Sequence, residues 1–131
     1  MTSVCDTRLL ITFRFPPSED AKQKITRLLQ RELGRRLLIP SIVITEYIKI
    51  VGKKVGLDAA ITHINELESR GAIVTDINRK IALEAGRLLN KHPDSPIADA
   101  LLAASANFHA AEYILTNDEH FEELGCKTRW I

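Results

Sequence analysis

Short apolar runs alternate with helix-forming segments along the whole chain. Apolar runs at 3–5, 37–39 and 72–75 are each followed by a segment with helical character, and two further runs lie at 112–116 and 127–130. Consecutive parallel strands need a long crossover connection, usually a helix, whereas antiparallel strands can be joined by a tight turn. The alternation therefore predicts an α/β fold in which a short parallel sheet has helices on both faces.

Serine, proline and glycine residues indicate where the helices begin and end. Helices are expected at 18–34, 41–51, 57–70, 78–91 and after Ser95-Pro96, with helical turns after residue 6 and at 119–124. Ser18, Ser41 and Ser95 are the expected N-cap residues, because a serine hydroxyl can accept a hydrogen bond from a free N–H of the first turn. Proline at 96 suits the first helical position, where its missing N–H costs nothing.

Length and composition bound the class of protein. The 131 residues have the length of one domain, expected to span 1–131, and 45% hydrophobic with 27% charged residues is the composition of an ordinary soluble protein. No apolar run approaches the ~20 residues of a membrane span, and the N-terminus lacks the basic and apolar regions of a secretory signal. Cys5 and Cys126 are too few and too far apart for a zinc motif or a disulfide framework. We therefore expect reduced cysteines and a cytoplasmic protein.

Four acidic residues, Asp6, Glu46, Asp99 and Asp118, lie against apolar runs rather than on polar faces. Asp6 and Asp118 follow predicted strands, Glu46 lies within an apolar helix, and Asp99 lies in the first turn of its helix. A lone carboxylate in a core is costly, so buried charges are normally paired or bound to a metal. In open parallel sheets the functional residues gather beyond the carboxyl ends of the strands, where all four can reach one site.

A cluster of four carboxylates predicts a particular kind of metal site. Like charges repel one another unless a cation lies among them. Oxygen ligands suit the hard ions Mg²⁺ and Mn²⁺, which keep waters and so leave room for a phosphate oxygen and an attacking water. One or two such ions can activate the water and stabilise the leaving oxygen of an in-line displacement. We expect Asp6, Glu46, Asp99 and Asp118 to be both the metal ligands and the catalytic residues.

Each acid also has a structural explanation that needs no metal. Asp6 is of a residue type favoured at N-caps, Asp99 can complement the dipole of its helix, and Asp118 can belong to a turn after Asn117. For Glu46 the alternative is a structural ion pair, which is the weakest of these explanations because an unpaired glutamate on an apolar face is rarely structural.

Positive charge is concentrated in the first part of the sequence. Residues 1–56 carry 11 Lys or Arg against 5 Asp or Glu, a formal +6, whereas residues 57–131 carry 7 against 12, a formal −5. A basic region can attract a nucleic-acid backbone, although the same residues also suit the solvated face of an amphipathic helix. We expect Arg8 and Arg14 to line the approach of an RNA substrate.

Four segments of the sequence resemble one known family. They are Val-Cys-Asp-Thr at 4–7, Pro-Ser-Ile-Val-Ile-Thr-Glu at 40–46, Ile-Ala-Asp-Ala-Leu-Leu-Ala-Ala-Ser-Ala at 97–106 and Leu-Thr-Asn-Asp-Glu-His-Phe at 115–121. In this order they are similar to the PIN domain, and in particular to the VapC-like toxins of prokaryotic toxin–antitoxin pairs. The resemblance spans nearly the whole chain, and its third and fourth segments are the most specific.

The resemblance implies a metal-dependent ribonuclease on a three-layer α/β/α fold with strand order 3-2-1-4-5. It implies that the four acids bind Mg²⁺ or Mn²⁺, with Thr116 and Asn117 as supporting residues around the fourth. It further implies hydrolysis of RNA that leaves a 5′-phosphate, a homodimer, and inhibition by a cognate antitoxin protein encoded beside it. One position departs from some members, which have a further acid two residues after the fourth, where this chain has His120.

Three other functions use related residues. A receiver-like signalling domain also holds Mg²⁺ with acids at strand ends, but it needs an acidic pair near the first strand end and would leave Glu46 and Asp99 unexplained. A phosphatase of the haloacid dehalogenase type needs a second Asp two residues after Asp6, where Arg8 stands. A non-catalytic RNA-binding or partner-binding module on the same fold is the main alternative, which the four intact acids disfavour.

Overall fold

The strands form one all-parallel sheet, as the alternation predicts. A computed structural model describes residues 1–131. Its strands are β1 (Thr2–Cys5), β2 (Arg36–Pro40), β3 (Ile73–Thr75), β4 (Tyr113–Leu115) and β5 (Thr128–Arg129). They pair in the order β3-β2-β1-β4-β5, and every pair is parallel. The predicted strand order is therefore confirmed.

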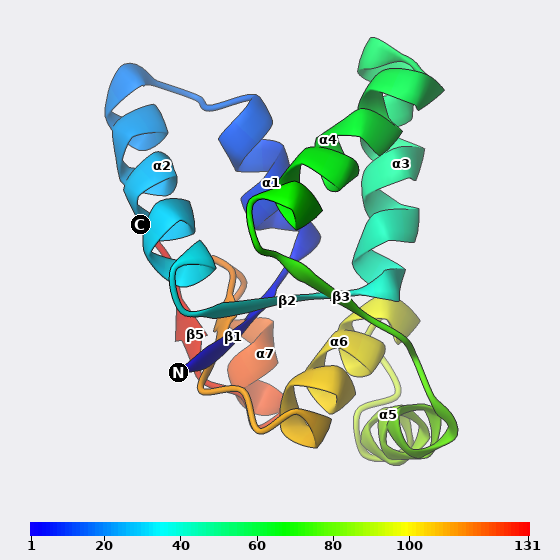
Figure 1. The fold of residues 1–131 in the computed structure, drawn as a ribbon. Helices are drawn as coiled ribbons and strands as arrows, with labels where there is room; N and C mark the ends of the chain where they lie inside the picture. Colours follow the sequence, from blue (N-terminus) through cyan, green and yellow to red (C-terminus); the bar gives the residue numbers. More distant parts are fainter.

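Helices connect the strands and cover both faces of the sheet (Figure 1). They are α1 (Thr7–Arg14), α2 (Glu19–Leu33), α3 (Ser41–Val55), α4 (Leu57–Ser69), α5 (Arg79–Lys91), α6 (Ile97–Phe108) and α7 (His120–Glu123). In Figure 1, α1 to α4 lie above the strands and α5 to α7 lie below them, which gives the expected three layers. None of these helices combines the length and the apolar character needed to cross a bilayer.

Side-chain caps fix the start of two helices. The Ser18 hydroxyl accepts a hydrogen bond from the Ala21 N–H at 3.0 Å, as predicted for the start of α2. The Asn78 side chain accepts one from the Ile81 N–H at 2.9 Å at the start of α5. Each bond satisfies one of the N–H groups that have no partner within the helix.

The predicted caps at Ser41 and Ser95 are wrong. Ser41 is the first residue of α3, and Pro40 occupies the N-cap position. Pro96 is the N-cap residue of α6, so Ser95 lies outside the helix and its hydroxyl makes no capping bond. In both places the fixed φ of proline holds an extended residue that leads directly into the helix.

The lengths of several elements differ from those predicted. Helix α3 continues four residues past 51 to Val55, and Gly56 follows it with a φ of +95° that few other residues adopt. Strands β3, β4 and β5 are shorter than the apolar runs that predicted them. Glu112, Thr116 and Lys127 still make backbone hydrogen bonds to neighbouring strands, but they lie just outside the paired strand residues, so the predicted runs extend one residue too far at these ends.

The core lies on both faces of the central strands. Val4, Leu38 and Ile114 are fully buried on neighbouring strands. Helix α6 packs against β1 and β4 with a series of buried alanines, which bring its backbone close to the sheet. Because Cys5 of β1 pairs in register with Leu115 of β4, the residues that follow these two strands emerge side by side.

Candidate active site

Asp6 and Thr116 are the first residues beyond the paired ends of β1 and β4. The Thr116 hydroxyl donates a hydrogen bond to Oδ2 of Asp6 at 2.6 Å and accepts one from the Asp118 N–H at 3.1 Å. Both Asp6 and Thr116 are buried. Asp6 occupies the N-cap position of α1, but its side chain makes no capping hydrogen bond. Its carboxylate is therefore directed to Thr116 rather than to the helix.

Glu46 reaches the same region from α3. Its Oε1 accepts a hydrogen bond from the Thr7 hydroxyl at 2.9 Å, which links α3 to the start of α1. No Lys, Arg or His side chain forms a salt bridge with Glu46. Thr7 was not predicted from the sequence, although a hydroxyl directly after Asp6 is a signal that could have identified it.

Asp99 lies in the first turn of α6 and faces the other acids. Burial raises the pKa of this carboxyl to about 6, with the negative charges of Asp6 and Asp118 contributing next. Burial is also the main reason that the pKa of Asp6 is raised, although the hydrogen bond from Thr116 acts in the opposite direction. Both carboxyls are therefore less easily ionised than an exposed acid, mainly because they are buried and, at Asp99, also because other acids lie near.

Asp118 uses one oxygen locally and presents the other to a cation. Its Oδ1 accepts a hydrogen bond from the His120 N–H at 2.9 Å, as in the turn that is the alternative explanation for this residue. Its Oδ2 lies 3.6 Å from Nη2 of Arg8, whose Nε lies 3.8 Å from Oδ2 of Asp6. The Arg8 side chain is largely exposed, so this single guanidinium screens the two acids only weakly.

All four acids line one cavity of about 400 Å³. Its lining residues are Asp6, Thr7, Arg8, Ile11, Glu46, Ile50, Pro96, Asp99 and Asp118. We call it the carboxylate cavity. It opens beyond the carboxyl ends of β1 and β4, where functional sites of parallel sheets are usually found.

Three of the other predicted site residues do not line the carboxylate cavity. Arg14 lies at the far end of α1 from Asp6, where its guanidinium pairs with Glu66 of α4. Asn117 is exposed and its side chain makes no hydrogen bond. Thr116 is not exposed in the cavity, but it contacts Asp6 from behind.

The carboxylate cavity suits a hard divalent cation by its donor chemistry. Its acids offer oxygen ligands, and burial raises the pKa values of Asp6 and Asp99 by disfavouring their charged forms, a cost that a bound cation would offset. No three acidic, histidine or cysteine side chains are grouped closely enough to enclose one ion. Mg²⁺ is often held by only one or two carboxylates while it keeps several waters, so the open arrangement is compatible with it.

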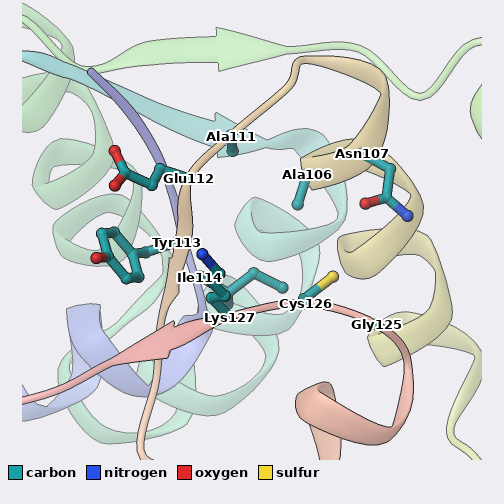
Figure 2. A pocket seen from close by; sticks show the side chains of 9 residues that line it. All are labelled: Ala106, Asn107, Ala111, Glu112, Tyr113, Ile114, Gly125, Cys126 and Lys127. Carbon is teal, nitrogen blue, oxygen red and sulfur yellow. The ribbon is translucent and has the colours of Figure 1, made fainter.

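A second hollow, of about 260 Å³, has a different character (Figure 2). It lies between the end of α6, the start of β4 and the segment before β5, and Cys126 lines it. Burial raises the pKa of the Cys126 thiol to about 11, and its Sγ lies 3.8 Å from the carbonyl oxygen of Ala103. A protonated thiol is a poor nucleophile, so the catalytic chemistry is expected at the carboxylate cavity instead.

Comparison with known proteins identifies the family. The sequence model of the PIN domain family matches residues 3–126, which is nearly the whole chain. The chain belongs to the PIN domain family. Among curated protein sequences none matches it.

Solved structures share the PIN fold at low sequence identity. VapBC2 from Rickettsia felis, bound to a promoter DNA fragment, matches with a TM-score of 0.79 and 18% identity over 99% of this chain and 98% of that chain. Mycobacterium tuberculosis VapC20, a sarcin-ricin loop cleaving toxin, matches with a TM-score of 0.78 and 15% identity over 95% of each chain. DNA-bound VapBC from Salmonella typhimurium matches with a TM-score of 0.72 and 20% identity over 99% and 98%.

Proposed function

We propose that this PIN domain is an endoribonuclease that uses Mg²⁺ or Mn²⁺ to hydrolyse RNA phosphodiester bonds. The observation that carries the proposal is the carboxylate cavity, where four acids from separate elements face one another with one exposed arginine between two of them. Such a group of like charges costs stability unless a ligand offsets it. A cavity that is costly without a cation and open to solvent is suited to binding one together with a substrate.

Different side chains around the cavity orient the acids and bind the substrate. Thr116 fixes the orientation of Asp6, and Thr7 fixes that of Glu46, through hydrogen bonds of 2.6 and 2.9 Å. The exposed guanidinium of Arg8 can donate to a phosphate oxygen of the RNA. When bound, a divalent cation supplies the Lewis acidity that activates water and stabilises the leaving oxygen.

RNA cleavage with Asp99→Asn tests this function. Wild-type protein should cut single-stranded RNA in Mg²⁺ or Mn²⁺ but not in EDTA, and Asp99→Asn should lower the rate by more than ~100-fold. Asp58→Asn is the matched control, because Asp58 is also an acid in the first turn of a helix, but it is exposed and outside the cavity. Wild-type activity in EDTA, or full activity of Asp99→Asn, would refute the assignment. RNA binding without cleavage would favour the non-catalytic binding module instead.

We further propose that the protein acts in the cytoplasm as the homodimeric toxin of a toxin–antitoxin pair. The proposal is supported by the similarity of its fold to VapBC2 from Rickettsia felis and VapBC from Salmonella typhimurium. The product of a neighbouring reading frame should then copurify with the protein and stop RNA cleavage. If the neighbouring product neither binds nor inhibits, the antitoxin part of the proposal is wrong while the nuclease part is unaffected.

A further inference from the structure

A polar pocket lies beside the carboxylate cavity, between the end of α5, the start of α6 and α7. Its volume is about 420 Å³, and its lining residues are Lys91, His92, Pro93, Asp94, Ser95, His120 and Glu123. We call it the α5–α6 pocket. None of the four acids of the carboxylate cavity lines it, so it is a separate hollow with its own chemistry.

Residues that are adjacent in the sequence line the α5–α6 pocket and the carboxylate cavity, so the two hollows are neighbours. Ser95 lines the pocket, and the next residue, Pro96, lines the cavity. On the other side, His120 lines the pocket and its backbone N–H donates to Asp118 of the cavity at 2.9 Å. A nucleic acid strand that places a phosphate at the four acids can therefore place an adjacent nucleotide in the pocket.

Two polar atoms of the α5–α6 pocket have no partner within the protein. Ser95 is only 8% exposed, yet its Oγ makes no hydrogen bond because Pro96 occupies the capping position of α6. Nε2 of His120 is also buried without a partner, while its Nδ1 lies 3.4 Å from Oε2 of Glu123. Leaving a buried polar group without a hydrogen bond destabilises the protein, so two such groups in one pocket point to a ligand that supplies the missing hydrogen bonds.

The mixture of charges favours a neutral ligand with both donors and acceptors. Lys91 is accompanied by the carboxylates of Asp94 and Glu123 in the same pocket. A phosphate would be repelled by the two carboxylates, because phosphate sites are built from donors. The edge of a nucleobase carries donors and acceptors together, and imidazole rings such as those of His92 and His120 are among the side chains on which unpaired RNA bases stack.

We propose that the α5–α6 pocket binds the unpaired base of the nucleotide next to the scissile phosphate, with Ser95 and His120 hydrogen-bonding its edge. The proposal rests on the RNA cleavage proposed above and adds the source of its sequence preference. A good hydrogen-bonded contact to a base edge discriminates by roughly 5- to 150-fold against the wrong base. One position beside the cut should therefore show a base preference of that size.

Mapping the cut sites in an RNA pool with randomised sequence tests the pocket. Ser95→Ala should flatten the base preference at one position beside the cut and leave the other positions as in wild type. Lys91→Met, at the pocket rim, is a second variant that should weaken the same preference. Ser69→Ala is the matched control, because Ser69 is exposed at the end of α4 and outside the pocket. If both pocket variants keep the wild-type preference at every position, the proposal is wrong although the nuclease assignment stands.

Binding without cleavage separates this proposal from the nuclease function. Fluorescently labelled RNA trinucleotides that differ only in the central base are titrated in EDTA with wild type, Ser95→Ala and Ser69→Ala. A preference for one base in wild type and Ser69→Ala that Ser95→Ala loses supports the pocket even if no RNA is cut. Equal affinities for all four bases in the wild type overturn it. Ser95→Ala should melt no lower than wild type, since it removes an unsatisfied hydroxyl.

Discussion

The carboxylate cavity and the surroundings of Glu32 both enclose acidic side chains, but they neutralise them differently. Glu32 of α2 is 1% exposed, and its Oε1 lies 3.8 Å from Nη1 of Arg129 and 4.0 Å from Nε of Arg31. Its Oε2 accepts a hydrogen bond from the Ser3 hydroxyl at 3.5 Å. The carboxylate cavity has four acids and only Arg8 among its lining cations.

This difference is the one expected between an acid that supports the fold and acids that bind a ligand. Two arginines near one carboxylate offset much of the cost of removing it from water, and the three groups depend on one another for stability. Four carboxylates that share one exposed arginine are not offset within the protein. We therefore expect Glu32 and its partners to support the folded state, and we expect the carboxylate cavity to reduce stability until a ligand binds.

Removing one arginine from each region should have the largest and most unequal effect. Arg129→Met leaves Glu32 buried with only Arg31 beside it and also removes the stacking of Arg129 on the Tyr113 ring at 4.1 Å. We expect a loss of about 2–3 kcal/mol in the free energy of unfolding. Arg8→Met should change it by less than ~1 kcal/mol, because the Arg8 guanidinium is largely exposed and lies 3.6 to 3.8 Å from its acidic partners. Urea unfolding in EDTA measures both, and equal losses would contradict the distinction.

Glu46→Gln tests whether the cavity recovers stability by binding metal. Free Mn²⁺ at about 100 times its Kd stabilises a folded protein by ~2.7 kcal/mol, and we expect the variant to lose most of that gain together with RNA cleavage. Without metal it should melt no lower than wild type, because an unpaired charge is removed and the Gln oxygen can still accept from Thr7. Melting curves with and without Mn²⁺ measure both effects. Glu84→Gln on the outer part of α5 is the control that should keep the full gain.

Ionisation of Asp99 should change the free energy of unfolding as the pH rises. Its folded-state pKa of about 6 lies above the ordinary value of 3.8, so the folded state binds more protons between these values. This carboxyl therefore makes the metal-free protein less stable as pH rises from about 4 to above 6. Asp99→Asn removes the effect, so the variant should match wild type near pH 4 and exceed it by about 1 kcal/mol at pH 7.5, after allowance for solvent screening. A variant that loses stability at pH 7.5 would show that Asp99 is structural.

The sheet and the four acids could be predicted because both follow from local sequence. Apolar runs that alternate with helices leave few arrangements other than a parallel sheet. Asp6 directly follows β1 and Asp118 lies three residues beyond the end of β4, and these two strands pair in register, so they bring the two acids to the same edge of the sheet. The family resemblance added the strand order, which no single run of residues specifies.

Side-chain contacts between distant segments could not be predicted in the same way. The Thr7–Glu46 hydrogen bond depends on how α1 packs against α3. Ser95 was the expected N-cap residue of α6, but Pro96 occupies that position. The positive charge of residues 1–56 predicts that Arg14 lies near the acids. Helix α1 instead carries Arg14 two turns away to Glu66, a partner 52 residues later in the sequence. Position along the chain did not reveal which face or end of a helix meets which neighbour.

The smallest expected effect is on the salt dependence of RNA binding when either arginine of α1 is replaced. It tests which of the two contacts RNA. Arg8 lines the carboxylate cavity, whereas Arg14 already has Glu66 as its partner. Each lost phosphate contact lowers the slope of log affinity against log salt by ~0.7 for single-stranded nucleic acid. Arg8→Ala should therefore reduce the slope by about that amount and weaken RNA binding a few-fold.

Arg14→Ala should leave the slope unchanged and lower stability slightly, because it breaks a partly exposed ion pair rather than a contact with RNA. RNA affinity measured in EDTA at several salt concentrations compares the two variants, and circular dichroism confirms that each is folded. If Arg14→Ala reduces the slope as much as Arg8→Ala, the RNA path extends along α1 to α4, and the basic region binds as a whole. If neither variant changes the slope, the positive charge of α1 is a solvated face, and the attraction of RNA must come from elsewhere in the protein.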